Sequence, residues 1–213
     1  MYTPNTTTKP FTDQTKVALI IVNSYDGTDF SLGQLVINDG LMTAERLQLN
    51  GYTPFIYHDP TVNQFVSILL KFIKQSFELV VYFSGHGSQI KDRDGDEDDG
   101  NDECLVFIDG LLPDDIIGSI LKLHRNKSLT LIADCCHSGT VFDSKSILTI
   151  SACHDNETAK QSIRKGQGVF TYYLWKYMDQ SKDIDDLIRK MNDKLRKYDQ
   201  RACSNKNKTL PLW

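Results

Sequence analysis

Short, almost uninterrupted apolar runs, each followed by a stretch with helical periodicity, constrain the fold of this chain more than any other feature. The main runs are Val17–Asn23, Leu79–Ser84 and Leu129–Asp134, with weaker ones at Thr53–Tyr57 and Ile147–Ala152. Continuous apolar runs of this length are typical of strands that are buried on both faces of a parallel sheet. Helical patterns lie between them at Gly33–Leu49, Val62–Phe77 and Pro113–Leu123. The alternation predicts the α/β class, a three-layer αβα sandwich with a mostly parallel central sheet.

The remaining segments predict one domain with a short N-terminal arm. Residues 1–15 are polar and rich in Thr, so we expect a flexible arm there. A further helix is expected at Val169–Met178, and the last helix places five apolar residues on one stripe, namely Ile184, Leu187, Ile188, Met191 and Leu195. A chain of 213 residues with 40% hydrophobic content is long enough for one well-buried domain, over residues 16–213.

Composition excludes several classes of protein. The formal net charge of −4, without a basic patch, argues against a nucleic-acid partner. No signal peptide opens the chain and no apolar run is long enough to span a bilayer, so we expect no membrane association and a cytoplasmic location. Five cysteines, two of them adjacent, make a poor disulfide framework. Reduced thiols are then available for chemistry.

Polar, reactive side chains follow two of the predicted strands. One strand runs into Ser84-Gly85-His86-Gly87, and a later one into "DCCHSG", residues 134–139. In open parallel sheets the active crevice lies beyond the carboxyl ends of the strands. Because side chains alternate along a strand, Asp134 and Cys136 should share one side of the sheet, and Cys135 should face the other side.

A thiol opposite an imidazole is the arrangement that a Cys–His peptidase needs. Cys136 would attack a carbonyl carbon, and His86 would act as general base and acid. Backbone N–H groups near Gly87 and Cys136 would hold the oxyanion. A zinc site from Cys135, Cys136, His137, Cys153 and His154 is an alternative, but adjacent ligands do not have the spacing of structural zinc sites. A thioredoxin-like role would need Cys-x-x-Cys, which is absent.

These motifs resemble one family. "YFSGHGSQ", the acidic "DRDGDEDDGNDE" and "DCCHSG", together with the upstream "LGQLVINDGLMTAERLQLNGY", are similar to the metacaspases, caspase-like cysteine peptidases. The resemblance covers residues 16–180 and implies a caspase-like fold, a monomer and Cys136 as the nucleophile. It further implies a type I-like catalytic core without its prodomain, divided into a large-subunit-like part (16–154), a short join (155–168) and a small-subunit-like part (169–213). The join contains basic residues at which a zymogen would cut itself, namely Lys160, Arg164 and Lys165.

The resemblance also implies specificity for substrates with Arg or Lys before the cleaved bond. Asp39 and Asp134 match the pocket acids of the family, and Ser84 matches a pocket serine. Two carboxylates favour a cationic side chain and repel Asp. Val36 is a departure, because it occupies a position where the family often has a cysteine that contributes to the pocket.

The acidic segment at residues 92–103 contains eight carboxylates. By itself such a run is typical of a solvated loop, and no register of it matches an EF-hand. In the metacaspases that bind calcium, however, the corresponding acids hold the ion. Carried over by position, the Ca²⁺ ligands are Asp102, Asp114, Asp115 and Asp143. Oxygen donors of this kind suit a hard cation such as Ca²⁺.

The sequence therefore predicts a calcium-activated cysteine endopeptidase that cleaves protein or peptide substrates after Arg or Lys. The alternative is a non-proteolytic caspase-like scaffold, in which calcium regulates the interaction with a partner. Retention of both His86 and Cys136 argues against the scaffold, because a scaffold needs neither residue.

Overall fold

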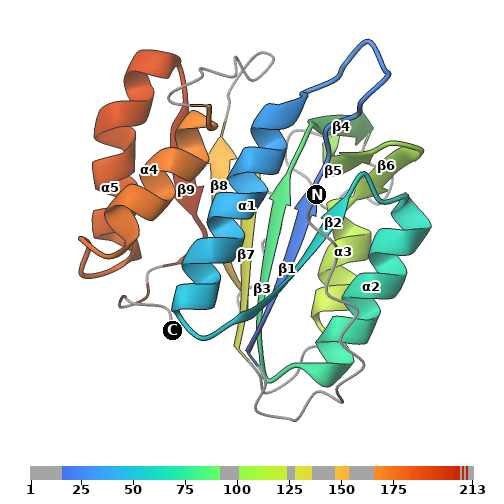
Figure 1. Cartoon of the computed structure of the whole chain (residues 1–213), viewed down its shortest axis with the longest axis horizontal. Helices are drawn as coiled ribbons and strands as arrows, with labels where there is room; N and C mark the ends of the chain where they lie inside the picture. The colour runs from blue at the N-terminus through green and yellow to red at the C-terminus, as the bar shows by residue number, and fades with distance from the viewer. Residues whose placement is uncertain are drawn as a thin grey trace.

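The computed structural model describes residues 16–91, 101–123, 128–135, 147–153, 166–206, 208 and 210. Its centre is a six-stranded sheet in the order β2-β1-β3-β7-β8-β9 (Figure 1). All neighbouring strands of this sheet are parallel except β9, which is antiparallel to β8. The strands are β1 (Lys16–Val22), β2 (Thr53–His58), β3 (Glu78–Ser84), β7 (Ser128–Asp134), β8 (Leu148–Cys153) and β9 (Arg201–Ser204). The predicted mostly parallel sheet is confirmed.

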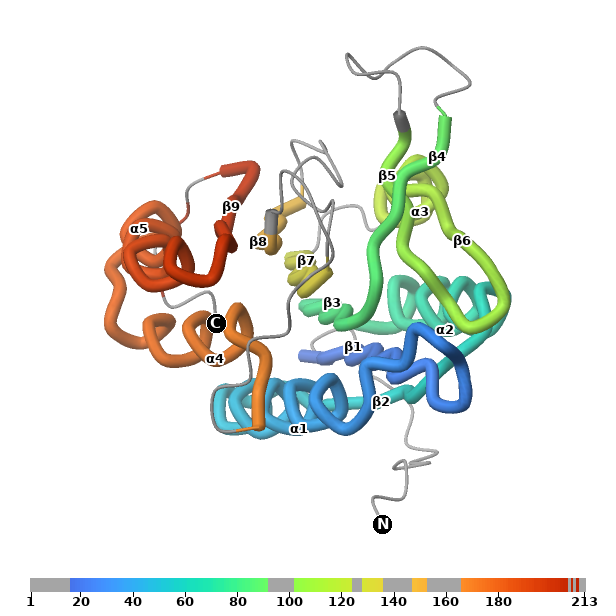
Figure 2. Tube along the Cα trace, turned by 90° about the horizontal axis from the view of Figure 1, so that it is seen from above, coloured from blue at the N-terminus to red at the C-terminus, as the bar shows by residue number. Residues whose placement is uncertain are grey.

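Helices cover both faces of this sheet and complete the three layers. Viewed along the strands, α1, α4 and α5 lie on one side and α2 and α3 on the other (Figure 2). The helices are α1 (Gln34–Leu49), α2 (Val62–Gln75), α3 (Asp114–Leu121), α4 (Val169–Met178) and α5 (Ile184–Leu195), which a short 3₁₀ turn follows at Arg196–Tyr198. Each predicted helix is present, with its ends shifted by no more than two residues.

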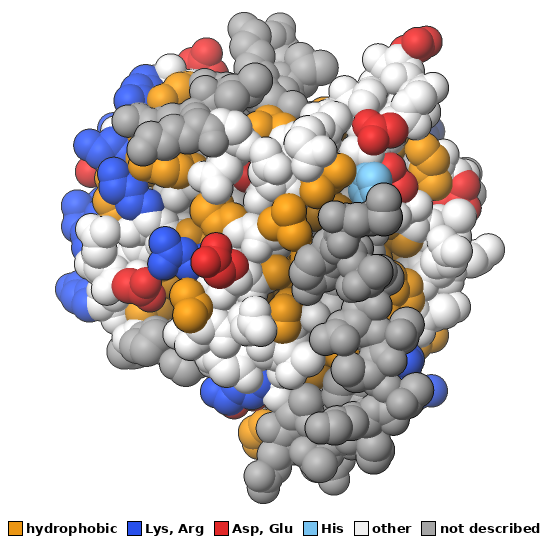
Figure 3. Space-filling view, in the orientation of Figure 1, with side chains coloured by type: hydrophobic (Ala, Val, Ile, Leu, Met, Phe, Trp, Pro, Cys, Tyr) orange, Lys and Arg blue, Asp and Glu red, His pale blue; other side chains and the backbone are white. Residues whose placement is uncertain are grey.

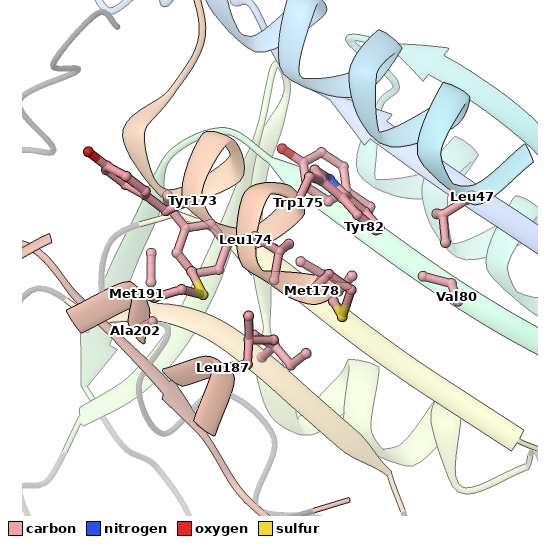
Figure 4. Close-up of a cluster of buried hydrophobic side chains, with 14 of the residues drawn as sticks. Leu47, Val80, Tyr82, Tyr173, Leu174, Trp175, Met178, Leu187, Met191 and Ala202 are labelled. Atoms are coloured by element: carbon pink, nitrogen blue, oxygen red, sulfur yellow. The ribbon is translucent and has the colours of Figure 1, made fainter. Parts of the chain in front are cut away.

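The sheet divides the hydrophobic core in two because side chains alternate along each strand. In β1, Ala18, Ile20 and Val22 contribute to the core under α1, α4 and α5. The residues between them, Val17, Leu19 and Ile21, contribute to the core under α2 and α3. Figure 4 shows the first core, where side chains of α4 and α5 pack against Val80 and Tyr82 of β3. The strands are therefore apolar on both faces, as the sequence pattern predicts.

Local signals in the sequence explain where two of the helices begin. Thr61 and Gln64 form a capping box before α2, because each side chain accepts a hydrogen bond from the other residue's backbone N–H. Asp183 caps α5 by accepting from the N–H of Asp186. The predicted apolar stripe of α5 is confirmed, since four of its members are fully buried and Ile188 is partly buried.

A second, three-stranded antiparallel sheet lies at the carboxyl end of β3, and the sequence analysis did not predict it. It has the order β4-β5-β6, from Gly87–Lys91, Asn101–Phe107 and Gly110–Pro113. Residues 101–103 were expected in an acidic loop, yet they begin β5. Polar residues in β4 and at the start of β5 conceal the strand pattern, and β9 was missed because it has only four residues, "RACS".

No helix in the described part of the chain is both long and apolar enough to cross a bilayer.

Lys and Arg side chains gather toward the α4–α5 side, at the left of Figure 3, while hydrophobic and uncharged atoms occupy the middle of this face. The predicted arm at residues 1–15 and nearly all of the predicted join at 155–168 lie outside the described residues.

Candidate active site

His86 lies at the junction between β3 and β4, at the carboxyl end of the main sheet. Its Nε2 atom is 2.8 Å from the backbone carbonyl oxygen of Phe30. Because a carbonyl oxygen only accepts hydrogen bonds, this contact places a proton on Nε2 and leaves the lone pair on Nδ1. The ring also packs against Tyr25 and Phe30, with ring centroids 4.9 and 6.0 Å away. His86 is thereby oriented as a base that can act through Nδ1.

Tyr25 fixes the backbone that presents His86. Its hydroxyl accepts a hydrogen bond from the His86 N–H at 2.9 Å and donates one to the Val106 carbonyl at 2.8 Å. Burial raises the pKa of Tyr25 well above its usual range, so the hydroxyl stays protonated. The residue has a φ of 53°, an uncommon conformation for a tyrosine, and its N–H donates to Asp59 Oδ1 at 3.0 Å.

A cavity opens beside His86 and brings together several residues that the sequence analysis singled out. Its lining includes Val36, Asp39, Ser84, His86 and Asp134. Ser84 and Asp134 are directly paired across β3 and β7, whereas Asp39 comes from α1. The three predicted pocket residues therefore do share one cavity with the predicted general base. Gly87, the predicted oxyanion residue, is the first residue of β4.

Two backbone or side-chain donors that the sequence analysis missed hold the pocket acids. The Gly168 N–H donates to both oxygens of Asp39, at 2.9 and 3.0 Å. The Thr171 hydroxyl donates to Asp134 Oδ2 at 2.7 Å and pairs with the Tyr82 hydroxyl. A Cβ atom on Gly168 would lie 2.6 Å from Asp39 Oδ2 and 3.4 Å from Asp134 Oδ2. Both carboxylates therefore border Gly168, and no larger residue fits there.

The acids have unusual protonation behaviour because they lie close together, Asp39 buried and Asp134 half-buried. Burial, and then the charge of Asp134, raise the pKa of Asp39 to about 8. Burial also raises the pKa of Asp134, to about 6, against the opposing effect of the hydrogen bonds from Thr171. Among the residues that the structure describes, no ion pair joins either acid to Lys, Arg or His. The pocket thus holds negative charge that a cationic ligand would neutralise.

Of the two adjacent cysteines, the structure describes Cys135. β7 ends at Asp134, and the next side chain, Cys135, is 3% exposed and belongs to the core under α2 and α3. Cys135 also borders the cavity beside His86, but its side chain is almost entirely buried. Cys136, the predicted nucleophile, lies outside the described residues. Its role therefore stays a prediction, which the burial of Cys135 supports.

Three of the four predicted calcium ligands lie in the described part of the chain. Asp102 is in β5, and Asp114 and Asp115 open α3. Asp102 and Asp114 are both 8% exposed. Burial raises the pKa of the nearby Cys104 thiol to about 11, and the charges of Asp114, Asp102 and Glu103 add to the effect. These acids therefore converge on one region of the fold.

The complete calcium site stays a prediction. Within the described ranges, no group of three or more His, Cys, Asp or Glu side chains is arranged to hold a metal ion. Asp143, the fourth predicted ligand, lies outside the described residues. The predicted cleavage positions Lys160, Arg164 and Lys165 also lie outside them.

The residues that sequence reasoning missed have a common physical cause. Phe30 acts through its carbonyl and Gly168 through its N–H, and every residue type supplies these groups, so neither leaves a signature in the sequence. Thr171 lies in a segment predicted only as a helix, and Tyr25 lies in the connection that follows the predicted strand Val17–Asn23. Their contacts depend on partners that are 37 and 61 residues away along the chain.

Comparisons with known proteins agree with this geometry. Residues 15–212 match the family described as the caspase domain. The chain is 47% identical over 81 residues to Metacaspase-1 of Yarrowia lipolytica, which is 35% of this chain and 18% of that protein. It is 31% identical over 156 residues to Metacaspase-2 of Trypanosoma brucei brucei, which is 63% of this chain and 44% of that protein. The chain thus spans less than half the length of these relatives.

A solved structure supports the fold alone. A crystal structure of a protein from Geobacter sulfurreducens superposes with a TM-score of 0.72 at 19% sequence identity, over 89% of this chain and 92% of that one. Together the comparisons confirm the predicted caspase-like α/β fold and the predicted resemblance to metacaspases.

Proposed function

We propose that this chain, which belongs to the caspase-domain family of caspase-like cysteine peptidases, is an endopeptidase that cleaves after Arg or Lys. The observation that supports the specificity most is the pair of carboxylates, the buried Asp39 and the half-buried Asp134, in the cavity beside His86. Burying a cationic side chain without a charged partner is costly, and these acids supply the partners. An Asp side chain in the same cavity would meet like charge.

The chemistry that we propose proceeds through an acyl-enzyme. The Cys136 thiol gives its proton to Nδ1 of His86, and the sulfur attacks the carbonyl carbon of the scissile bond. The carbonyl oxygen becomes negative and accepts hydrogen bonds from backbone N–H groups near Gly87 and Cys136. His86 then gives the proton to the leaving amine, and the C–N bond breaks. In the second half, His86 takes a proton from water and the hydroxyl adds to the acyl carbon. The C–S bond then breaks, and the sulfur regains a proton from His86, which restores the thiol and the neutral ring.

The contact with Phe30 supports this role for His86. When Nδ1 takes up the thiol proton, the ring becomes positively charged with both nitrogens protonated. Its Nε2–H still donates to the Phe30 carbonyl at 2.8 Å, which stabilises the charged ring and keeps its plane fixed. The ring therefore gains and loses a proton without turning. Tyr25 holds the His86 backbone throughout.

The proposal includes activation by Ca²⁺, for which the donor chemistry of the described residues is suitable. Asp102, Asp114 and Asp115 supply carboxylate oxygens, and two of these acids are buried close enough to influence one thiol. When bound, Ca²⁺ would neutralise their mutual repulsion. The protein's own contribution would be to order β5 and the start of α3 near the substrate cavity. Asp143 would complete the set by position in the sequence.

Covalent labelling tests the proposed enzyme class. A peptide that ends in Arg and has a thiol-reactive group at its carboxyl end should attach to Cys136, as identified by mass spectrometry. Cys136→Ala should abolish labelling while the protein stays folded, and Cys135→Ser should keep it, because Cys135 faces the core. His86→Ala should slow labelling strongly. Labelling of Cys135 instead, or no labelling of any cysteine, would overturn the proposal.

A further inference from the structure

Gln200 is a buried amide in the same cavity as the two acids. It lies immediately before β9, lines the cavity with Asp39 and Asp134, and is 6% exposed. Its side-chain oxygen, Oε1, is inaccessible to solvent and accepts no hydrogen bond from any described residue. A buried acceptor without a partner is uncommon, because the group has lost its hydrogen bonds to water without replacing them. Such an atom in a ligand cavity indicates a missing donor.

The backbone around Gln200 is held by hydrogen bonds, which fix the position from which its side chain enters the cavity. The Gln200 N–H donates to the Leu195 carbonyl at 3.3 Å. Two residues later, the Ala202 N–H donates to the Asn192 side chain at 2.7 Å, and the Ala202 carbonyl accepts from it at 2.9 Å. α5 therefore fixes the entry into β9. An acceptor that is positioned before the ligand arrives contributes to affinity at low entropic cost.

The other acceptors of the cavity leave a clear role for Gln200. Asp39 and Asp134 supply the charge that either Arg or Lys requires, and each already accepts a hydrogen bond from the protein. An ammonium is a compact group with three donors, whereas a guanidinium is a wider planar group with five. A neutral acceptor adds a hydrogen-bonding position without adding charge. A neutral acceptor therefore favours the guanidinium of Arg, which has more N–H donors than the ammonium of Lys.

We propose that Gln200 is a specificity-determining residue, whose Oε1 accepts a hydrogen bond from the guanidinium of a substrate Arg and so favours Arg over Lys. This inference rests on the proposed function, because it assumes that the cavity receives the cationic side chain. It adds a residue from the C-terminal part of the chain, and one that bears no charge. A prediction of the pocket from its charged residues alone would miss Gln200.

The test compares matched peptide substrates that differ only in Arg or Lys before the cleaved bond. Gln200→Leu and Gln200→Met remove the acceptor, and Gln200→Met keeps an unbranched chain in case Gln200→Leu fails to fold. Gln200→Glu keeps an acceptor. Gln48→Leu, an exposed position on α1, is the matched control. The measured quantities are kcat and KM for each peptide, at one pH and in the presence of Ca²⁺.

We expect the apolar variants to lower kcat/KM for the Arg peptide by about 10-fold or more, mainly through KM, since a hydrogen bond to a charged group is lost. The Lys peptide should change by less than about 3-fold. Gln200→Glu should keep efficient cleavage after Arg, and Gln48→Leu should match the wild type. An Arg/Lys ratio that is unchanged in the apolar variants would overturn the inference alone. A wild-type enzyme that cuts neither peptide would instead overturn the proposed function.

Discussion

The carboxyl group of Asp39 shows how one buried residue can couple binding to protonation. It is 2% exposed, it lies beside Asp134, and its pKa is raised to about 8. Near neutral pH the empty cavity therefore holds a proton on this pair of acids. A cationic ligand favours the ionised form, so its arrival releases that proton. The ionised form of both acids is therefore favoured when a cation occupies the cavity and disfavoured when the cavity is empty.

The first prediction concerns stability and pH. In the unfolded chain both acids return to their usual pKa near 4, so between pH 4 and 8 the folded state holds a proton that the unfolded state has lost. Stability should therefore fall as pH rises through this window, by about 3–5 kcal/mol for the pair between pH 5 and pH 8. Asp39→Asn should flatten the decline. Urea unfolding at several pH values measures how the free energy of unfolding depends on pH. The same dependence in the wild type and in Asp39→Asn would contradict the raised pKa of Asp39.

A second prediction concerns Gly168, whose φ of −62° is one that alanine adopts freely. The effect of Gly168→Ala must then come from its Cβ, which would lie 2.6 Å from Asp39 Oδ2. We expect a loss of about 1–3 kcal/mol of stability and at least a 10-fold decrease in kcat/KM for Arg peptides. Gly118→Ala in α3 is the control, since nothing lies within 4 Å of its Cβ. Equal stability and equal kcat/KM in Gly168→Ala and Gly118→Ala would disprove the close contact between Gly168 and Asp39.

At the scale of elements, the loop between β1 and α1 matters most, because it supplies two contacts to a histidine at the end of β3. The Ser24 hydroxyl donates to Asp59 at 2.8 Å, and Asp59 accepts from the Tyr25 N–H. These contacts tie the loop to the end of β2 and hold Tyr25 at its positive φ. The loop in turn places the Phe30 carbonyl on His86. The orientation of the His86 ring therefore depends on this loop as well as on the strand that precedes the histidine.

Tyr25→Phe tests this positioning role. The variant leaves the His86 N–H and the Val106 carbonyl without their hydroxyl partner, which should cost about 1–3 kcal/mol of stability. We expect kcat to fall about 10-fold or more with little change in KM. Tyr57→Phe, at a partly buried tyrosine of β2, should leave kcat unchanged. A Tyr25→Phe enzyme that loses stability but keeps its kcat would show a merely structural role.

The elements also show what a sequence can and cannot predict. The strands of the main sheet were predictable because both of their faces are buried, as the continuous apolar run at Val17–Val22 indicates. His86 was predicted from its place after a strand, and Asp39, Ser84 and Asp134 from the resemblance to the metacaspases; all four line one cavity, and their roles stay predictions. β4 to β6 were missed, because their pairing depends on partners across a hairpin and not on an apolar pattern. The Phe30 carbonyl, the Gly168 N–H and Gln200 were missed because only the fold brings them to the site.

The whole molecule assembles its cavity from segments that are far apart along the chain. Asp39 and Asp134 come from the predicted large-subunit-like part, whereas Thr171 and Gln200 come from the predicted small-subunit-like part. The pocket is complete only when both parts are folded together. Three of the acids proposed to bind Ca²⁺ lie in β5 and at the start of α3, and none of the three lines the cavity. Calcium would thus act on loop order and not on the pocket charge.

The calcium prediction can be measured by both activity and stability. Peptidase activity should be low in excess chelator and should rise with Ca²⁺, and the unfolding midpoint should rise as well, because the ion binds the folded state. Asp115→Ala and Asp143→Ala should need more Ca²⁺ or fail to respond. Asp193→Ala, an exposed acid of α5, should respond as the wild type does. Equal activity and equal midpoints in chelator and in millimolar Ca²⁺ would reject activation by calcium without affecting the roles of His86 and Cys136.

The central claim is that a Cys136–His86 pair beside Asp39 and Asp134 cleaves peptide bonds after cationic residues. The most direct measurement is kcat/KM for three matched peptides with Arg, Lys or Asp before the cleaved bond, using wild-type protein and Cys136→Ala in the presence of Ca²⁺. We predict that the Arg and Lys peptides are cut at least about 10³-fold faster than the Asp peptide, and that Cys136→Ala cuts none of them. Efficient cleavage after Asp, or undiminished cleavage by Cys136→Ala, would contradict the account.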